Sequence, residues 1–127
     1  MSVWSFNFEK LQAWQKSREL NKEIYGITRA FPQTEQFGLV SQMRRAAVSV
    51  SSNLAEGMSR STAREQIRFV EIAYGSLMEV FCQVVLAGDA GLLSAAEVEE
   101  LRAKISEIAA MLSGLRKSIV RRSAEKS

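Results

Sequence analysis

The sequence predicts an all-α protein, an antiparallel four-helix bundle of the up-down-up-down kind, in a single domain over residues 1–127. Apolar residues recur at steps of three and four along most of the chain, and no segment alternates with a period of two. The only proline and most of the seven glycines fall where such segments stop. The segments are joined by short connections, which favours antiparallel neighbours over long crossovers.

The first two helices are expected over about residues 8–31 and 34–56. Asn7 is a candidate N-cap for the first, and Pro32 ends it because the residue before a proline is pushed away from helical geometry. Gly57 is the candidate C-terminal cap of the second. The first helix is expected to bury Leu11, Trp14, Ile24, Ile27 and Phe31, with Asn21 as a polar interruption, and the second Val40, Met43, Ala47, Val50 and Leu54.

The last two helices are expected over about residues 62–88 and 95–121, followed by a frayed tail over 122–127. Thr62 with Glu65, and Ser94 with Glu97, have the spacing of capping boxes. The third helix is apolar over more than one stripe, so it is either central or shared with another subunit. Its apolar residues are Ile67, Val70, Tyr74, Leu77, Phe81 and Val84, widened by Phe69, Ala73, Val80 and Val85. The fourth shows a heptad of Val98, Leu101, Ile105, Ile108, Leu112, Leu115 and Ile119.

Composition places the chain among ordinary globular proteins, with 46% hydrophobic and 24% charged residues and a formal net charge of +3. The single cysteine, Cys82, lies in an apolar segment and is expected to be a buried, inert thiol. The start of the chain lacks the pattern of a signal peptide, and the densest apolar run, at residues 80–88, is too short to span a bilayer. We therefore expect a cytoplasmic protein without a membrane partner.

The residues that most catalytic sites require are missing. The sequence contains no histidine, which removes the commonest general base and the commonest transition-metal ligand. It has no Gly-rich phosphate loop, and Cys82 has no histidine to activate it. We expect no enzymatic activity, no catalytic or metal-binding residues and no cofactor.

Residues 41–57 combine small side chains with charge. On a helix, Arg45, Ser49, Ser52 and Glu56 follow one another at steps of three and four, with Asn53 alongside, and form a thin polar flank beside the apolar row. Small side chains let another backbone approach closely. The flank could pack against a neighbouring helix of the same bundle, belong to a subunit interface, or contact a ligand or nucleic acid.

Basic residues gather where the predicted topology brings chain segments together. In an antiparallel bundle, the end of the second helix and the start of the third lie beside the end of the fourth. These bases form a candidate binding surface for phosphate backbones, although they could equally serve only to solubilise the surface, and Arg68 could simply pair with Glu65 or Glu71. The candidates at this pole are Arg60, Arg64, Arg68, Arg116, Lys117, Arg121 and Arg122. Arg44 and Arg45 on the second helix are further candidates for binding or for a subunit interface.

Four stretches carry a resemblance to a known family: "FEKLQAWQKSRELNKEIYGITRAFP" (8–32), "FGLVSQMRRAAVSVSSNLAEG" (37–57), "RFVEIAYGSLMEV" (68–80) and "ISEIAAMLSGLRKSI" (105–119). In this order they resemble the four helix bundle proteins, also called the 23S rRNA-intervening-sequence proteins, of bacteria. Asn53, Glu56 and Gly57 match the motif of that family. Ser51 stands where the family usually has a proline, so the bend that a proline causes should be weaker here.

The resemblance implies a four-helix bundle without enzymatic activity that assembles as a ring-like homopentamer. A related branch comprises the accessory proteins of diversity-generating retroelements, in which a basic pentamer binds a reverse transcriptase and nucleic acid. We therefore expect a homo-oligomeric binding or scaffold protein that associates with RNA or other nucleic acid through its basic pole. The alternative is a protein adaptor that presents a ring surface to a partner such as a reverse transcriptase, without binding nucleic acid itself.

Overall fold

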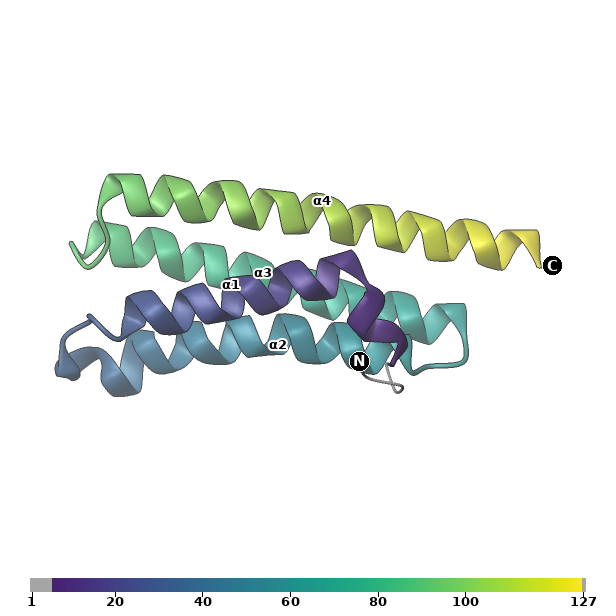
Figure 1. The fold of residues 1–127 in the computed structure, drawn as a ribbon, viewed down its shortest axis with the longest axis horizontal. Coiled ribbons are helices and arrows are strands. Elements are labelled where there is room, and N and C mark those ends of the chain that lie inside the picture. Colours follow the sequence, from purple (N-terminus) through teal and green to yellow (C-terminus); the bar gives the residue numbers. More distant parts are fainter. Residues whose placement is uncertain (1–5, 127) are drawn as a thin grey trace, which may run out of the picture.

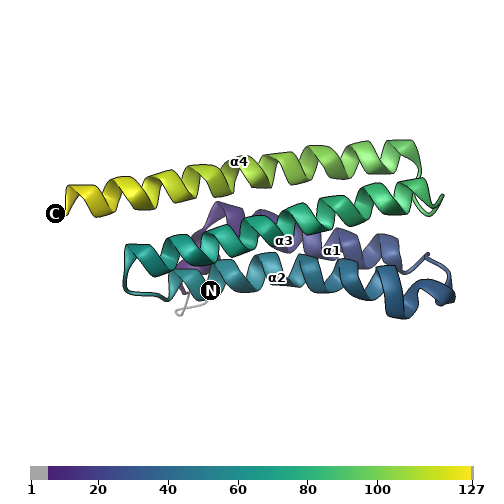
Figure 2. The same ribbon diagram turned by 180° about the vertical axis from the view of Figure 1, so that it is seen from behind.

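The computed structural model describes residues 6–126, and over this range the chain is helical, with four long helices and no strand. The helices α1 (Gln12–Thr28), α2 (Ser41–Met58), α3 (Ala63–Asp89) and α4 (Ala95–Glu125) run alternately up and down (Figure 1). Seen from behind, α3 lies alongside both α2 and α4 (Figure 2). The expected all-α, antiparallel four-helix arrangement is confirmed.

The first helix is shorter than expected at both ends. Asn7 does not cap it but begins a separate 3-10 turn, η1 (Asn7–Lys10), and α1 starts after Leu11, whose backbone is extended at φ −75° and ψ 121°. At the other end α1 stops at Thr28, whose hydroxyl donates a hydrogen bond back to the carbonyl of Ile24 at 2.6 Å. Such a local bond competes with the helix and is common near helix ends.

The connection between α1 and α2 is also irregular. It contains a 3-10 turn, η2 (Gln33–Glu35), and a π-helical turn, η3 (Gln36–Val40), so that α2 begins at Ser41 and not near residue 34. Gly38 interrupts the helix with φ −112° and ψ −106°. Next to this interruption the side chain of Phe37 is 97% exposed.

Gly57 is not the C-terminal cap that the sequence suggested, because α2 continues to Met58 and buries this glycine. A Cβ atom at Gly57 would lie 2.8 Å from the Cβ of Phe69 on α3, closer than real Cβ atoms come. The glycine is therefore required where α2 and α3 approach each other closely.

The expected starts of α3 and α4 are confirmed. The hydroxyl of Thr62 accepts from the Glu65 amide at 3.2 Å, and Ser94 with Glu97 forms a complete capping box. The helix α4 continues to Glu125, so the expected fraying from residue 122 is wrong over 122–125, and Ser127 lies outside the described residues. The last turns of α4 project beyond the α2–α3 connection (Figure 1).

The core follows the expected pattern in α2 and α4 and departs from it in α1 and in part of α3. All five expected positions of α2 are buried, and the heptad of α4 is buried except at Val98 and Leu115, which are half-buried. In α1 the buried face is rotated towards small residues, and Leu11, Trp14 and Ile27 are only half-buried. The buried residues of α1 are Ala13, Ser17, Leu20, Ile24 and Thr28.

The helix α3 has a buried face and an apolar outer face. Val70, Leu77 and Val84 are buried, as expected, whereas Tyr74 is 38% exposed. Cys82 is exposed, so the expectation of a buried thiol is wrong. The reason is geometric: its position on the helix faces away from Leu77 and the rest of the core.

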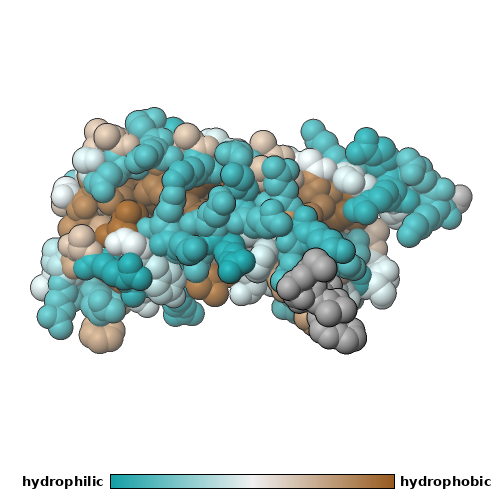
Figure 3. Space-filling model, viewed as in Figure 1, coloured by the Kyte–Doolittle hydropathy of each residue, from teal (hydrophilic) through white to brown (hydrophobic). Residues whose placement is uncertain are grey.

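Among the described helices, α3 alone is long and apolar enough to cross a bilayer. The apolar run at 80–88, expected to be too short for this, is part of the longer helix. A single helix of this kind is also typical of the core helix of a soluble bundle, and α3 packs against both α2 and α4. The view in Figure 3 shows apolar surface between the helices, while the projecting end of α4 is largely hydrophilic.

Candidate nucleic-acid interface

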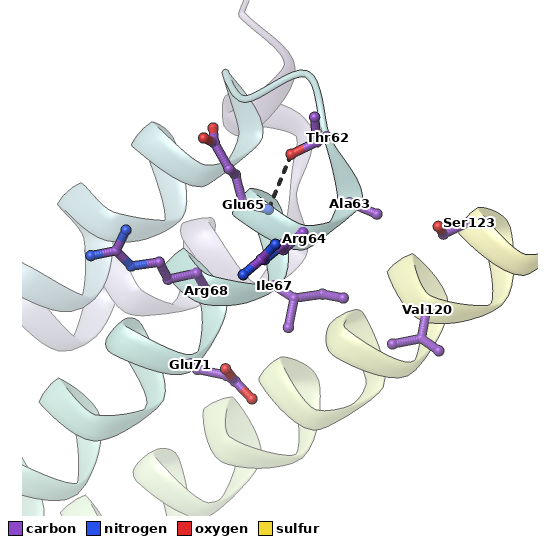
Figure 4. A pocket seen from close by; sticks show the side chains of 9 residues that line it. All are labelled: Thr62, Ala63, Arg64, Glu65, Ile67, Arg68, Glu71, Val120 and Ser123. Carbon is purple, nitrogen blue, oxygen red and sulfur yellow. Dashed lines mark hydrogen bonds between the residues drawn. The ribbon is translucent and has the colours of Figure 1, made fainter.

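The start of α3 and the end of α4 lie together at one end of the bundle, which we call the basic pole. A shallow groove runs between the two helices here. Ile67 from α3 and Val120 from α4 point towards each other across it, and Arg64 and Arg68 lie on its α3 side (Figure 4). The predicted convergence of these segments is therefore correct.

Several cations at the basic pole have no ion pair with any residue in 6–126. On α3 these are Arg64 and Arg68, one turn apart and both exposed. The corresponding residues of α4 are exposed and recur at the helical spacing of four residues: Lys117 with Arg121, and Arg122 with Lys126. Arg122 and Lys126 line a second hollow beside Ser61 and Gln66.

Two of the expected binding residues are neutralised within the chain. Arg60 pairs with Glu56 at 2.6 Å, and its guanidinium lies 4.9 Å from the centre of the Phe69 ring. Arg116 pairs with Glu71 at 3.0 Å. Both cations are held by these contacts, so Arg60 and Arg116 help to join helices or turns and are less available to a phosphate.

The ion pair between Arg116 and Glu71 also decides a question that the sequence left open. Arg68 could have paired with Glu65 or Glu71, but it makes no ion pair within the described residues, and the nearest turn of α4 takes the Glu71 carboxylate instead. Arg68 therefore remains available, and it extends away from α4 in Figure 4.

Arg44 and Arg45 lie at the other end of the bundle, near the start of α2, and do not contribute to the basic pole. Arg44 stacks on Tyr25 at 4.5 Å and donates to the hydroxyl of Thr28 at 3.0 Å, which ties α2 to α1. Arg45 is exposed and has no ion pair among residues 6–126.

The polar flank of α2 is divided between the bundle and the solvent. The hydroxyls of Ser49 and Ser76 are hydrogen-bonded at 2.7 Å between α2 and α3, and Asn53 donates to the Ser49 carbonyl at 2.8 Å. This part of the flank packs within the bundle. Ser52 is exposed, Arg45 is free, and Glu56 is engaged with Arg60.

Sequence reasoning missed two residues that bear on binding. Lys126 falls in the segment expected to fray, although its spacing of four from Arg122 aligns the two on a continued helix. Phe37 is not among the expected site residues, because nothing in its neighbours indicates the π-helical turn that exposes it.

Comparison with known proteins agrees with this architecture. The profile of the 23S rRNA-intervening sequence proteins matches residues 9–114. The chain belongs to this family. No curated protein matches the chain.

One solved structure is similar to this chain in fold. It is the crystal structure of a protein of unknown function from the S23 ribosomal protein family of Bacteroides thetaiotaomicron VPI-5482. It aligns with a TM-score of 0.77 at 19% sequence identity, over 83% of this chain and 98% of that one. At this level of identity the likeness supports the fold. The groove residues must therefore be judged on their own chemistry.

Proposed function

We propose that this member of the family is a non-catalytic protein that associates with copies of itself and binds RNA or another nucleic acid at its basic pole. The observation that carries the proposal is the set of free cations on both sides of one end of the bundle. These are Arg64 and Arg68 from α3, and Lys117, Arg121, Arg122 and Lys126 from α4.

These cations are suited to phosphates. Arginine and lysine side chains bind nucleic acid mainly through its backbone, by displacing condensed counterions. The C-terminal end of α4 carries a helix dipole worth about half a negative charge. Three cations in the last turns, Arg121, Arg122 and Lys126, outweigh that dipole and Glu125 together. On the α3 side Glu65 also lines the groove without an ion pair among residues 6–126, but it is outnumbered there by Arg64 and Arg68. The net charge at the pole is therefore positive.

The groove favours contact with the backbone over reading of bases. The residues that line it include Ile67 and Val120 but no aromatic side chain on which a base could stack. We expect weak dependence on sequence and strong dependence on salt.

Self-association would multiply this charge. The outer face of α3 leaves Ile72, Met78 and Leu86 exposed at 40%, 37% and 51%, an apolar surface that a second copy would cover. Burial of this face between copies would repeat the basic pole around an assembly. The family resemblance puts the number of copies at five.

A paired charge reversal tests binding at the pole. The variant Arg64→Glu/Arg122→Glu should bind structured RNA at least about tenfold more weakly than the natural chain, because phosphates then meet carboxylates. The matched control, Lys22→Glu/Arg29→Glu, makes the same change in net charge at two exposed residues of α1 and its following turn, and should bind nearly as the natural chain does. Fluorescence anisotropy at several salt concentrations measures both.

The salt dependence gives a second reading of the same experiment. The logarithm of the association constant falls with the logarithm of salt by about 0.9 for each phosphate contacted on a duplex. The slope of the pole variant should therefore be shallower than that of the control. If both variants lose the same affinity for RNA, the attraction comes from net charge alone and not from the basic pole. If the natural chain does not bind RNA even at low salt, the proposal is wrong.

The adaptor is the second candidate function, and one observation favours it: Glu56 and Glu71 already neutralise Arg60 and Arg116, which lowers the free charge at the pole. An adaptor should show no RNA binding at low salt while it still assembles. The same titration therefore separates the two candidates.

The thiol of Cys82 reports on self-association directly. It is exposed in the single chain and lies on the outer face of α3, so assembly should slow its reaction with a maleimide as protein concentration rises. The control is Ser106→Cys in a Cys82→Ser background, because Ser106 is exposed on α4. Its reaction should not depend on concentration. If the reaction rate of Cys82 is also independent of protein concentration, the outer face of α3 is not buried between copies.

A further inference from the structure

An apolar groove lies at the end of the bundle opposite to the basic pole. Its volume is about 590 Å³, and it is lined by Tyr25 of α1, by Val40 at the end of η3 and by Val48 of α2. Phe37, 97% exposed, stands at its edge, and Arg45 lies on the α2 side. We call this the Phe37 groove. An almost fully exposed phenylalanine beside an open apolar hollow is typical of a surface that is covered in use.

The outer face of α3 carries a row with the spacing of a coiled-coil seam. Its members follow at steps of three, four, three and four: Ile72, Gly75, Glu79, Cys82 and Leu86. We call this row the α3 outer strip. Ile72 and Leu86 are its large apolar ends, and a Cβ added at Gly75 would meet nothing within 4 Å. Glu79, at the centre, is exposed and has no ion pair among residues 6–126.

We propose that the Phe37 groove of one copy receives the α3 outer strip of the next copy. This inference rests on the proposed self-association and names the two surfaces that perform it. The two surfaces differ from each other, so the contact is heterologous: each copy contributes its groove to one neighbour and its strip to the other.

The shapes of the two surfaces support this pairing. Gly75 and Cys82 have small side chains and project little on either side of Glu79, between Ile72 and Leu86, which are separated by about 21 Å at 1.5 Å per residue. A projecting ring such as Phe37 packs most easily over small residues of this kind, in the manner of a knob in a hole. The apolar ends of the strip then lie against the exposed Val48 and the rim of the groove.

The charges select the same arrangement. A two-fold contact of strip with strip would set Glu79 against Glu79 near its centre, and a contact of groove with groove would bring Arg45 towards Arg45. Like charges that face each other across an interface disfavour association. The heterologous contact instead sets the free carboxylate of Glu79 beside the free guanidinium of Arg45.

The position of the surfaces on the bundle favours closure. The groove lies mainly on α2 and the strip on α3, two neighbouring helices whose outer faces point in different directions. Repetition of the contact therefore turns from copy to copy, as a closed ring requires. Nucleic acid fits these surfaces less well, because Glu79 repels phosphate and Arg44 in the groove is already engaged with Tyr25.

Two charge reversals test the pairing. The single variants Arg45→Glu and Glu79→Arg should each associate at least about thirtyfold more weakly than the natural chain, because like charges then meet at every junction. An equal mixture of the two should associate again. A junction between the two different variants joins a carboxylate to a cation whichever of them contributes the groove, and only contact between different chains can produce this recovery. A ring of five copies cannot alternate throughout, so recovery is read as a mass above that of one chain.

A third variant tests the apolar part. Phe37→Ser should also weaken association about thirtyfold while it leaves the thermal unfolding of the dissociated chain unchanged, since the ring is 97% exposed. Analytical ultracentrifugation measures assembly for all variants, and circular dichroism confirms that each is helical. Phe37→Ser keeps the test valid should a charge variant fail to fold.

The outcomes separate this inference from the proposed function. If the natural chain is monomeric, both the inference and the proposed self-association are wrong. If the natural chain assembles and Phe37→Ser assembles equally well, copies meet through other surfaces and only the inference is wrong. If the two charge variants are monomeric alone and remain so when mixed, the pairing of Arg45 with Glu79 is wrong. RNA binding at the pole is measured independently by the Arg64→Glu/Arg122→Glu variant.

Discussion

Replacement of Leu77 with alanine should lower the free energy of unfolding by about 2–5 kcal/mol, the range for a leucine deleted from a close-packed core. Leu77 is fully buried on the inner face of α3, where no solvent can fill the space that its side chain leaves. Urea denaturation followed by circular dichroism, at a protein concentration low enough for dissociated chains, measures the loss.

The matched control is Leu86→Ala on the opposite face of the same helix, where the leucine is 51% exposed. In dissociated chains this change should cost less than about 1 kcal/mol, because little of the side chain is removed from water. At higher concentration the same variant should associate more weakly than the natural chain. If the two variants lose the same free energy of unfolding at low concentration, α3 does not have one buried and one exposed face.

The variant Gly57→Ala should be destabilised by about 1–3 kcal/mol, although alanine is the better helix former by about 1 kcal/mol. The added Cβ would lie 2.8 Å from the Cβ of Phe69, an atom fixed to the α3 backbone that cannot rotate aside. To accommodate it, α2 and α3 must move apart, which also loosens the bond between Ser49 and Ser76. Thermal unfolding monitored by circular dichroism measures the change.

Gly26→Ala is the control for this effect. Gly26 also lies within a helix, but a Cβ there meets nothing within 4 Å, so the helix propensity of alanine should act alone and raise stability by up to about 1 kcal/mol. If alanine raises the thermal stability at both positions, α2 and α3 are not in close contact at Gly57.

The parts of the fold that the sequence predicted correctly are those in which large apolar residues determine the buried face. In α2 and α4, residues such as Val50, Leu54 and Leu112 recur at the helical period and are buried as expected. The inner face of α1 was predicted less well, because small residues decide it. Ala13 and Ser17 are buried, and Ser17 bonds the hydroxyl of Ser51 at 3.0 Å.

The bond between Ser17 and Ser51 gives a local reason for the absence of proline at position 51. A proline here would remove a backbone donor from the middle of α2, whereas Ser51 lies within an uninterrupted helix and also contacts α1. The bend expected of a proline is therefore replaced by a polar contact between helices.

The candidate site was predictable as a region but not as a set of contacts. Antiparallel topology brings the start of α3 to the end of α4, so the convergence of Arg64 with Arg122 follows from helix order alone. Which cations stay free depends on the register between helices. That register gives Arg116 to Glu71, a pairing between helices that the helical period does not show. Arg60 and Glu56 stand four residues apart and pair across the end of α2.

The mass of the purified protein tests the central claim most directly, because both the repeated basic pole and the covered face of α3 depend on association between copies. Light scattering at micromolar concentration should give a whole-number multiple of the 14.2 kDa chain, fivefold if the family resemblance holds for assembly. A mass of one chain over the whole concentration range would contradict the account, since the exposed strip of α3 would then have no covering surface.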